Sequence, residues 1–209
     1  MNRKKMAKLT SVAAAAALLM TAAANLPKMD AAAAGLSGLD AKAITSQMTI
    51  GWNLGNSLDA NSATIKDPAK SAMCWGNPEP TKELFETVKA GGFNTVRIPT
   101  TWYPHISYNE TEKRWDVDDE WMDYVKMTVD YAYELDMFVI LNVHHEDWVN
   151  VAEFTDATYA DASAKLEGIW TEVAQVFADY DQHLIFEGMN EPRQTGLGGS
   201  VEWGAGDNN

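Results

Sequence analysis

The chain alternates between short apolar runs and longer segments whose apolar residues recur with a helical period. Four apolar runs predict buried strands at residues 48–56, 93–99, 137–145 and 184–192, at a regular spacing of about 45 residues. Between them, helical periodicity predicts helices at residues 81–92, 118–135 and 162–180. Thr81 is a suitable N-cap for the first of these helices, and Gly91-Gly92 is a suitable stop signal.

Strands that alternate with helices predict right-handed parallel βαβ units, in either a doubly wound sheet or a closed barrel. The polar residues favour the barrel, because every predicted strand carries them at its C-terminal end: Asn53, Arg97, His144 and Glu191. In a (β/α)8 TIM barrel, functional groups from several strands meet on that one face. The glycine spacing after the first strand does not fit a dinucleotide-binding loop. Eight units of this spacing need on the order of 360 residues, so we expect the chain to supply about the first four βα units of an α/β barrel.

The N-terminal residues have the pattern of a secretory signal peptide. Basic residues at positions 3–8 precede an apolar run at residues 12–24, and small residues at 31–34 offer a cleavage site. We expect residues 1–34 to be removed and residues 35–209 to begin the barrel, in a secreted, extracellular protein of bacterial type. An alanine-rich leader or a retained anchor is the alternative.

Charge and composition narrow the class of partner. The formal net charge is −14, which argues against binding to nucleic acid. No later apolar run is long enough to cross a membrane, and Cys74 is the single cysteine of the sequence. The eight tryptophans are compatible with flat apolar faces that stack on sugar rings.

Four motifs resemble those of glycoside hydrolase family 5, the cellulase family. They are GWNLGNSLD, FNTVRIPTTW, VILNVHHED and IFEGMNEPR, and the similarity covers residues 48–193. The resemblance implies a barrel-fold endo-β-1,4-glucanase that acts on a polysaccharide by retaining double displacement and needs no cofactor. Neighbouring branches of the family cut xyloglucan, lichenan or mannan.

The resemblance also implies roles for individual residues. Glu191 matches the general acid/base, and Asn190 matches the residue that binds the sugar 2-hydroxyl. Arg97 matches the arginine that supports the nucleophile, and His144 matches a histidine that lines the cleft. The nucleophilic glutamate is expected beyond residue 209, so the isolated fragment is expected to be inactive. It is also expected to be poorly stable, because half a barrel leaves the first and fourth strands with open edges.

The motif around Glu191 contains a second carboxylate, Glu187. Since Glu187 lies on the strand itself, we expect a structural role for it, with Arg97 as partner. Pro192 disfavours the α conformation of the preceding residue, which predicts an extended Glu191 at the rim of the barrel.

Four further residues are expected to bind substrate: His145, Asn53, Trp148 and Trp75. For the two tryptophans, packing in loops is the alternative to stacking on sugar. Trp203 is a further candidate for the cleft, whereas Trp52 and Trp102 are expected to pack in the interior.

Other functions are less consistent with the sequence. The HHED segment that begins at His144 lacks the H-E-x-x-H spacing of zinc peptidases, so we expect no metal site. His105 and His183 are expected at the surface. A non-catalytic carbohydrate-binding barrel and a metal-dependent hydrolase remain as rivals, and a C-terminal binding module or dockerin could follow.

Overall fold

The computed structural model describes residues 38–149 and 155–192. The predicted leader at residues 1–34 and Trp203 lie outside the described residues, so both remain predictions.

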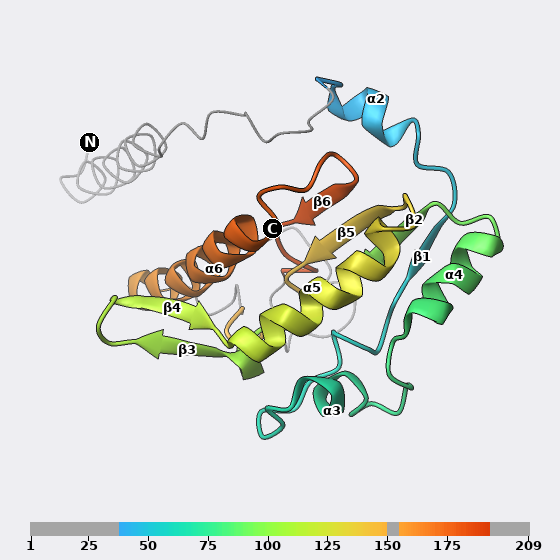
Figure 1. The fold of residues 1–209 in the computed structure, drawn as a ribbon. Helices are drawn as coiled ribbons and strands as arrows, with labels where there is room; N and C mark the ends of the chain where they lie inside the picture. Colours follow the sequence, from blue (N-terminus) through green and yellow to red (C-terminus); the bar gives the residue numbers. More distant parts are fainter. Residues whose placement is uncertain (1–37, 150–154, 193–209) are drawn as a thin grey trace, which may run out of the picture. The chain divides into compact units, whose positions relative to one another are not determined.

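The described residues form a four-stranded parallel sheet with the strand order β1-β2-β5-β6 (Figure 1). The strands are β1 (Gly51–Asn53), β2 (Thr95–Ile98), β5 (Phe138–Asn142) and β6 (Leu184–Glu187). Each strand pairs in parallel with the next, as in the first four units of a (β/α)8 barrel, which confirms the predicted fold class. The strands are shorter than predicted because the polar residues that follow them leave the sheet as loops.

The three predicted helices are present. They are α4 (Lys82–Ala90), α5 (Asp119–Tyr133) and α6 (Asp156–Val176). The last helix begins earlier than predicted because Thr155 and Thr158 form a reciprocal capping box. Helix α5 packs against β5 and against α4, so its apolar stripe covers this side of the sheet.

Several short elements were not predicted. They are α2 (Ala41–Thr45), α3 (Pro68–Ala72), the 3-10 turn η1 (Tyr103–His105) and an antiparallel hairpin of β3 (Ile106–Asn109) and β4 (Arg114–Val117). The hairpin lies alongside α6 (Figure 1). The contact is close, since a Cβ on Gly168 of α6 would clash with the carbonyl oxygen of Trp115.

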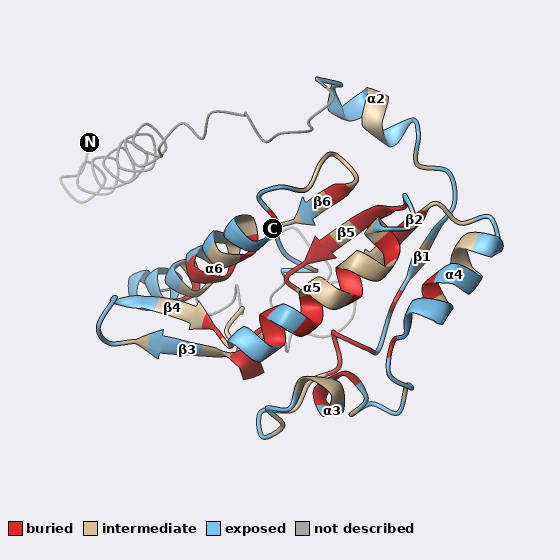
Figure 2. Cartoon of the chain, in the orientation of Figure 1, coloured by how far each residue is buried: buried red, intermediate tan, exposed pale blue. Residues whose placement is uncertain are grey.

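The core lies between the sheet and its helices, and β2, β5 and one stripe of α5 are buried (Figure 2). Trp102 is fully buried and Trp52 packs against the core, as predicted. The prediction for His105 was wrong, because this side chain is fully buried and stacks on Trp121 with ring centroids 4.1 Å apart. Burial lowers the pKa of His105 to about 4, so the ring is neutral. His183 is partly exposed, beside Asp181 in the loop before β6.

The outer strands of the described sheet, β1 and β6, have one unpaired edge each. On β6, Phe186 is 43% exposed. Within the described part of the chain, no helix has both the length and the apolar character needed to span a bilayer.

Candidate active site

Arg97 at the end of β2 connects the C-terminal ends of three strands. Its Nε donates to Glu187 Oε2 at 2.8 Å and its Nη2 donates to Glu187 Oε1 at 2.5 Å. Nη2 also donates to Asn190 Oδ1 at 3.0 Å, and Nη1 lies 3.5 Å from Asn53 Oδ1. The predicted structural pairing of Glu187 with Arg97 is therefore confirmed. The guanidinium lowers the pKa of Glu187, so this carboxylate is ionised and held by both oxygens.

Asn142 is a fully buried amide at the end of β5. The backbone N–H of Thr100 donates to its Oδ1 at 3.1 Å, which fixes the orientation of the amide. Its Nδ2 then has two hydrogens to donate, one to Glu187 Oε1 at 2.8 Å and one to His144 Nδ1 at 3.1 Å. Burial, with smaller effects of His145 and Arg97, lowers the pKa of His144 to about 4. His144 is therefore neutral, accepts at Nδ1 and carries its proton on Nε2.

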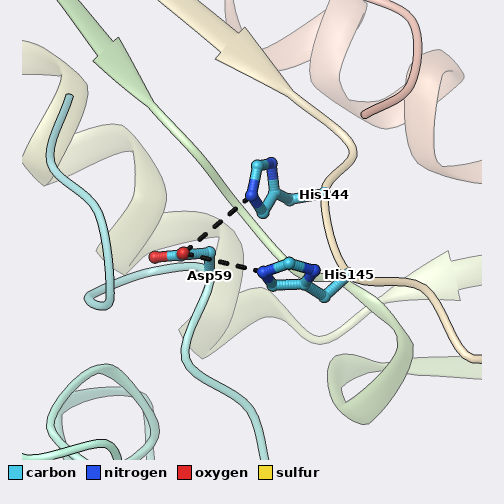
Figure 3. Close-up of side chains that lie close together, drawn as sticks. All are labelled: Asp59, His144 and His145. Atoms are coloured by element: carbon cyan, nitrogen blue, oxygen red, sulfur yellow. Dashed lines mark ion pairs between the residues drawn. The ribbon is translucent and has the colours of Figure 1, made fainter. Parts of the chain in front are cut away.

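Asp59 lies opposite both histidines (Figure 3). Its Oδ1 accepts from the backbone N–H of Ser57 at 2.9 Å. Its Oδ2 is 4.0 Å from His144 Nε2 and 3.9 Å from His145 Nε2. Because β5 ends at Asn142, the adjacent histidines do not alternate between the two faces of a strand, and both reach the same carboxylate.

This trio has the residue types of a metal site, but its geometry and tautomer do not fit one. Two bonds of about 2.1 Å spanning the 4.0 Å between Asp59 Oδ2 and His144 Nε2 would require an angle of about 145°, far from tetrahedral. Coordination through Nε2 would also move the His144 proton to Nδ1, where it would face the amino group of Asn142. The alternative amide orientation would place Oδ1 against the Glu187 carboxylate.

A pocket of about 250 Å³ opens at this end of the sheet. It is lined by Asn61, Tyr103, His144, His145, Glu146, Asp147, Val149, Asn190 and Glu191. The Asn190 backbone N–H donates to the carbonyl of Val143 at 2.7 Å, which ties the segment after β6 to the segment after β5.

The extended conformation predicted for Glu191 was wrong, since its φ is +43°. Proline disfavours the right-handed α region for the residue before it, and here the backbone takes the left-handed region in place of the extended one. Such a conformation is uncommon for a residue with a Cβ and is found at functional sites. Glu191 remains exposed at the pocket.

Glu146 also brings a carboxyl group to the pocket, in addition to Asp147 and Glu191. Its Oε1 accepts from the backbone N–H of Trp102 at 2.7 Å. Burial raises its pKa to about 7, so it holds a proton in mildly acidic solution.

The two tryptophans predicted to bind substrate are placed differently. Trp75 is 46% exposed, and its ring centroid lies 5.6 Å from that of His145, beside the pocket. Trp148 packs against the core and lines a separate, more apolar pocket with Met189 and Pro192. Trp75 is therefore better placed than Trp148 to meet a ligand near the histidines.

The structure brings six predicted site residues to one end of the sheet: Asn53, Arg97, His144, His145, Asn190 and Glu191. Three residues near the site were not predicted from the sequence: Asp59, Asn142 and Glu146. Asn142 had a recognisable signal, because a polar amide interrupts the apolar run VILNV. Asp59 is the last residue of the motif GWNLGNSLD, but the motif gave no sign that the loop after β1 brings this carboxylate to the histidines.

The fold and the site define a parallel βα enzyme scaffold with its polar groups at the C-terminal ends of the strands. The family model of cellulase (glycosyl hydrolase family 5) matches residues 58–209. The chain belongs to glycosyl hydrolase family 5.

Similar proteins agree with this assignment. Endoglucanase B of Neocallimastix patriciarum is 42% identical over 82% of this chain and 36% of its own length. A GH5-4 broad specificity endoglucanase from Ruminococcus champanellensis, solved with bound cellotriose, has a TM-score of 0.72 and 42% identity, over 82% of this chain and 49% of that one. A GH5-4 broad specificity endoglucanase from Ruminococcus flavefaciens has a TM-score of 0.69 and 49% identity, over 80% and 45%. The chain thus spans less than half the length of each of these proteins.

Proposed function

We propose that this chain is the N-terminal part of an endo-β-1,4-glucanase that hydrolyses glucan with retention, with Glu191 as general acid/base. The similar endoglucanases support a cellulase activity, and the structure solved with cellotriose supports a polysaccharide substrate. The observation that carries the proposal is the separation of the two carboxylates around β6. Arg97 holds Glu187 by both oxygens, whereas Glu191 lies at the pocket beside the histidines.

The chemistry assigns each group a distinct task. In retaining hydrolysis an acid protonates the leaving glycosidic oxygen while a second carboxylate, about 5–5.5 Å away, attacks the anomeric carbon. Water then displaces the enzyme carboxylate, and the first residue accepts the proton of that water. Glu191 takes the acid/base role, and the nucleophile belongs to a part of the protein beyond residue 209. Asn190, held by Arg97, presents its amide for the sugar 2-hydroxyl.

The same proposal includes export of the protein. Residues 1–34 act as the signal peptide, and the barrel works outside the cell on a polymer that is too large to enter. Sequencing the N-terminus of the secreted protein tests this. A mature protein that begins upstream of residues 31–34 would contradict it.

Glu191→Gln in the complete protein tests the acid/base role. General acid–base catalysis contributes about 10²–10⁴-fold, so hydrolysis of carboxymethyl cellulose should fall by that factor. An aryl cellobioside with a dinitrophenolate leaving group needs little protonation, so formation of its glycosyl-enzyme should be much less impaired. Added azide should restore turnover of this aryl substrate, because the anion needs no general base to attack the intermediate.

Glu112→Gln is the matched control, since Glu112 is exposed in the β3–β4 turn, away from the pocket. It should leave both substrates unaffected. Equal losses on the two substrates in the Glu191 variant would contradict an acid/base role. Unchanged activity would remove Glu191 from the mechanism and favour the carbohydrate-binding alternative.

A further inference from the structure

The tautomer of His144 is set from the interior of the protein. Asn142 accepts from Thr100 through Oδ1 and donates to Glu187 and His144 through Nδ2, so its amide has a single orientation that satisfies all three contacts. The Nδ1 atom of His144 can therefore only accept, and Nε2 carries the proton.

The Nε2–H group faces the carboxylate of Asp59 across 4.0 Å. This distance is too long for a direct hydrogen bond, but it suits two groups that share one hydroxyl, each about 2.8–2.9 Å from its oxygen. Such a hydroxyl donates to Asp59 and accepts from His144. A group that only donates or only accepts would satisfy one of the two side chains alone.

We propose that Asn142 is a positioning residue that holds His144 in the Nε2–H form, so that His144 and Asp59 offer one donor and one acceptor to a single sugar hydroxyl. This inference rests on the proposed function, since it takes a glucan as the ligand. It extends the site to Asn142 and Asp59, to which the family resemblance assigned no role. The Nε2 atom of His145 lies 3.9 Å from the same carboxylate oxygen.

The first test reads the tautomer and needs no activity. Nitrogen NMR of the complete protein, labelled with ¹⁵N-histidine and assigned with His144→Gln, should show His144 as the neutral Nε2–H tautomer. Asn142→Asp places a carboxylate oxygen opposite Nδ1 and should move the proton to that atom. Asn94→Asp makes the same change at the other end of β2, where Asn94 contacts Thr49 and Gln47, and should leave the signals of His144 unchanged.

The second test measures how well the site binds and hydrolyses glucan. In a Glu191→Gln background, which removes turnover from the measurement, Asp59→Asn should weaken cellotriose binding at least tenfold. In the otherwise unchanged protein, Asn142→Asp should lower kcat/KM on carboxymethyl cellulose at least tenfold, whereas Asn94→Asp should not.

Each outcome decides between alternatives. An Nδ1–H tautomer in the unmodified protein would overturn the proposal, and that measurement stands even if the Asn142 variant does not fold. A reversed tautomer with unchanged kcat/KM, or unchanged cellotriose binding after Asp59→Asn, would also overturn it. A fully active Glu191→Gln variant would overturn the proposed function while the tautomer and binding results stand on their own.

Discussion

Glu146 illustrates how one residue at the pocket couples protonation to stability. Its carboxyl group has a pKa of about 7 in the folded chain because of burial, against an ordinary value of 4.5. Between these values the folded state binds the proton more strongly than the unfolded state does. Stability from this group is therefore highest below about pH 4.5, declines as pH rises to about 7, and is then constant.

Glu146→Gln should remove this pH dependence. The neutral amide retains an oxygen for the Trp102 backbone N–H, so at pH 8 the variant should be more stable than the unmodified protein by about 1–3 kcal/mol. Thermal midpoints of the complete protein at pH 5 and pH 8 measure the effect. An equal fall in midpoint for both proteins would assign the pH dependence to other groups, and Glu112→Gln controls for the change in net charge.

Individual side chains differ in how far the sequence reveals them. The pairing of Glu187 with Arg97 was predictable, because parallel strands place both residues at the same end of the sheet. His105 was not, because its burial depends on η1 turning the ring onto Trp121, a tertiary contact with no local signal. The left-handed backbone of Glu191 could not be predicted with certainty. Pro192 disfavours the right-handed α region for Glu191, which leaves both the extended and the left-handed regions.

Among the elements, the β3–β4 hairpin and α6 form the tightest described contact at a glycine. The Cβ that Gly168→Ala adds would clash with the Trp115 carbonyl oxygen, so the helix or the hairpin must shift. Alanine favours a helix by about 1 kcal/mol over glycine, but overpacking costs about 1–3 kcal/mol, and contact with rigid backbone favours the upper end. A net loss of stability is therefore expected.

Thermal unfolding of the complete protein measures this loss. Gly55→Ala is the control, because a Cβ on Gly55 meets nothing within 4 Å and its φ lies outside the left-handed region. An unchanged or raised thermal midpoint for Gly168→Ala would show that the hairpin can move to accommodate the Cβ without loss of stability.

The elements themselves were predictable where their periodicity was strong. The apolar runs and helical stripes located all four strands of the described sheet and the three longest described helices. The β3–β4 hairpin was not predicted, because its strands are short and partly exposed and show little alternation of apolar and polar residues. Helix α3 was not predicted, because a helix of five residues shows almost no periodicity of apolar residues.

For the whole molecule, the exposed edges of β1 and β6 predict association when residues 35–209 are produced alone. Unpaired strand edges recruit other strands, and Phe186 adds an exposed apolar side chain at the edge of β6. Light scattering should show oligomers that grow with concentration, and cellulase assays should show no activity.

Phe186→Lys should reduce this association, because a charged edge residue disfavours strand addition. Tyr159→Lys removes an exposed aromatic from α6 and should have little effect, since it leaves the edge unchanged. A monomeric, active product from residues 35–209 would contradict the expectation for the isolated segment.

The contact between Arg97 and Glu187 also has a consequence for synthesis on the ribosome. The two residues are 90 positions apart and belong to strands that are not neighbours in the sheet. At about 5–20 residues per second, Arg97 is made some 5–20 s before its partner. During this interval β1, β2 and β5 can be complete. Burying the end of β2 before Glu187 is made would leave the permanent positive charge of Arg97 without its counter-ion. The end of the sheet around Arg97 should therefore be among the last parts of this segment to order. Until then, the nascent chain exposes unpaired strand edges to other chains.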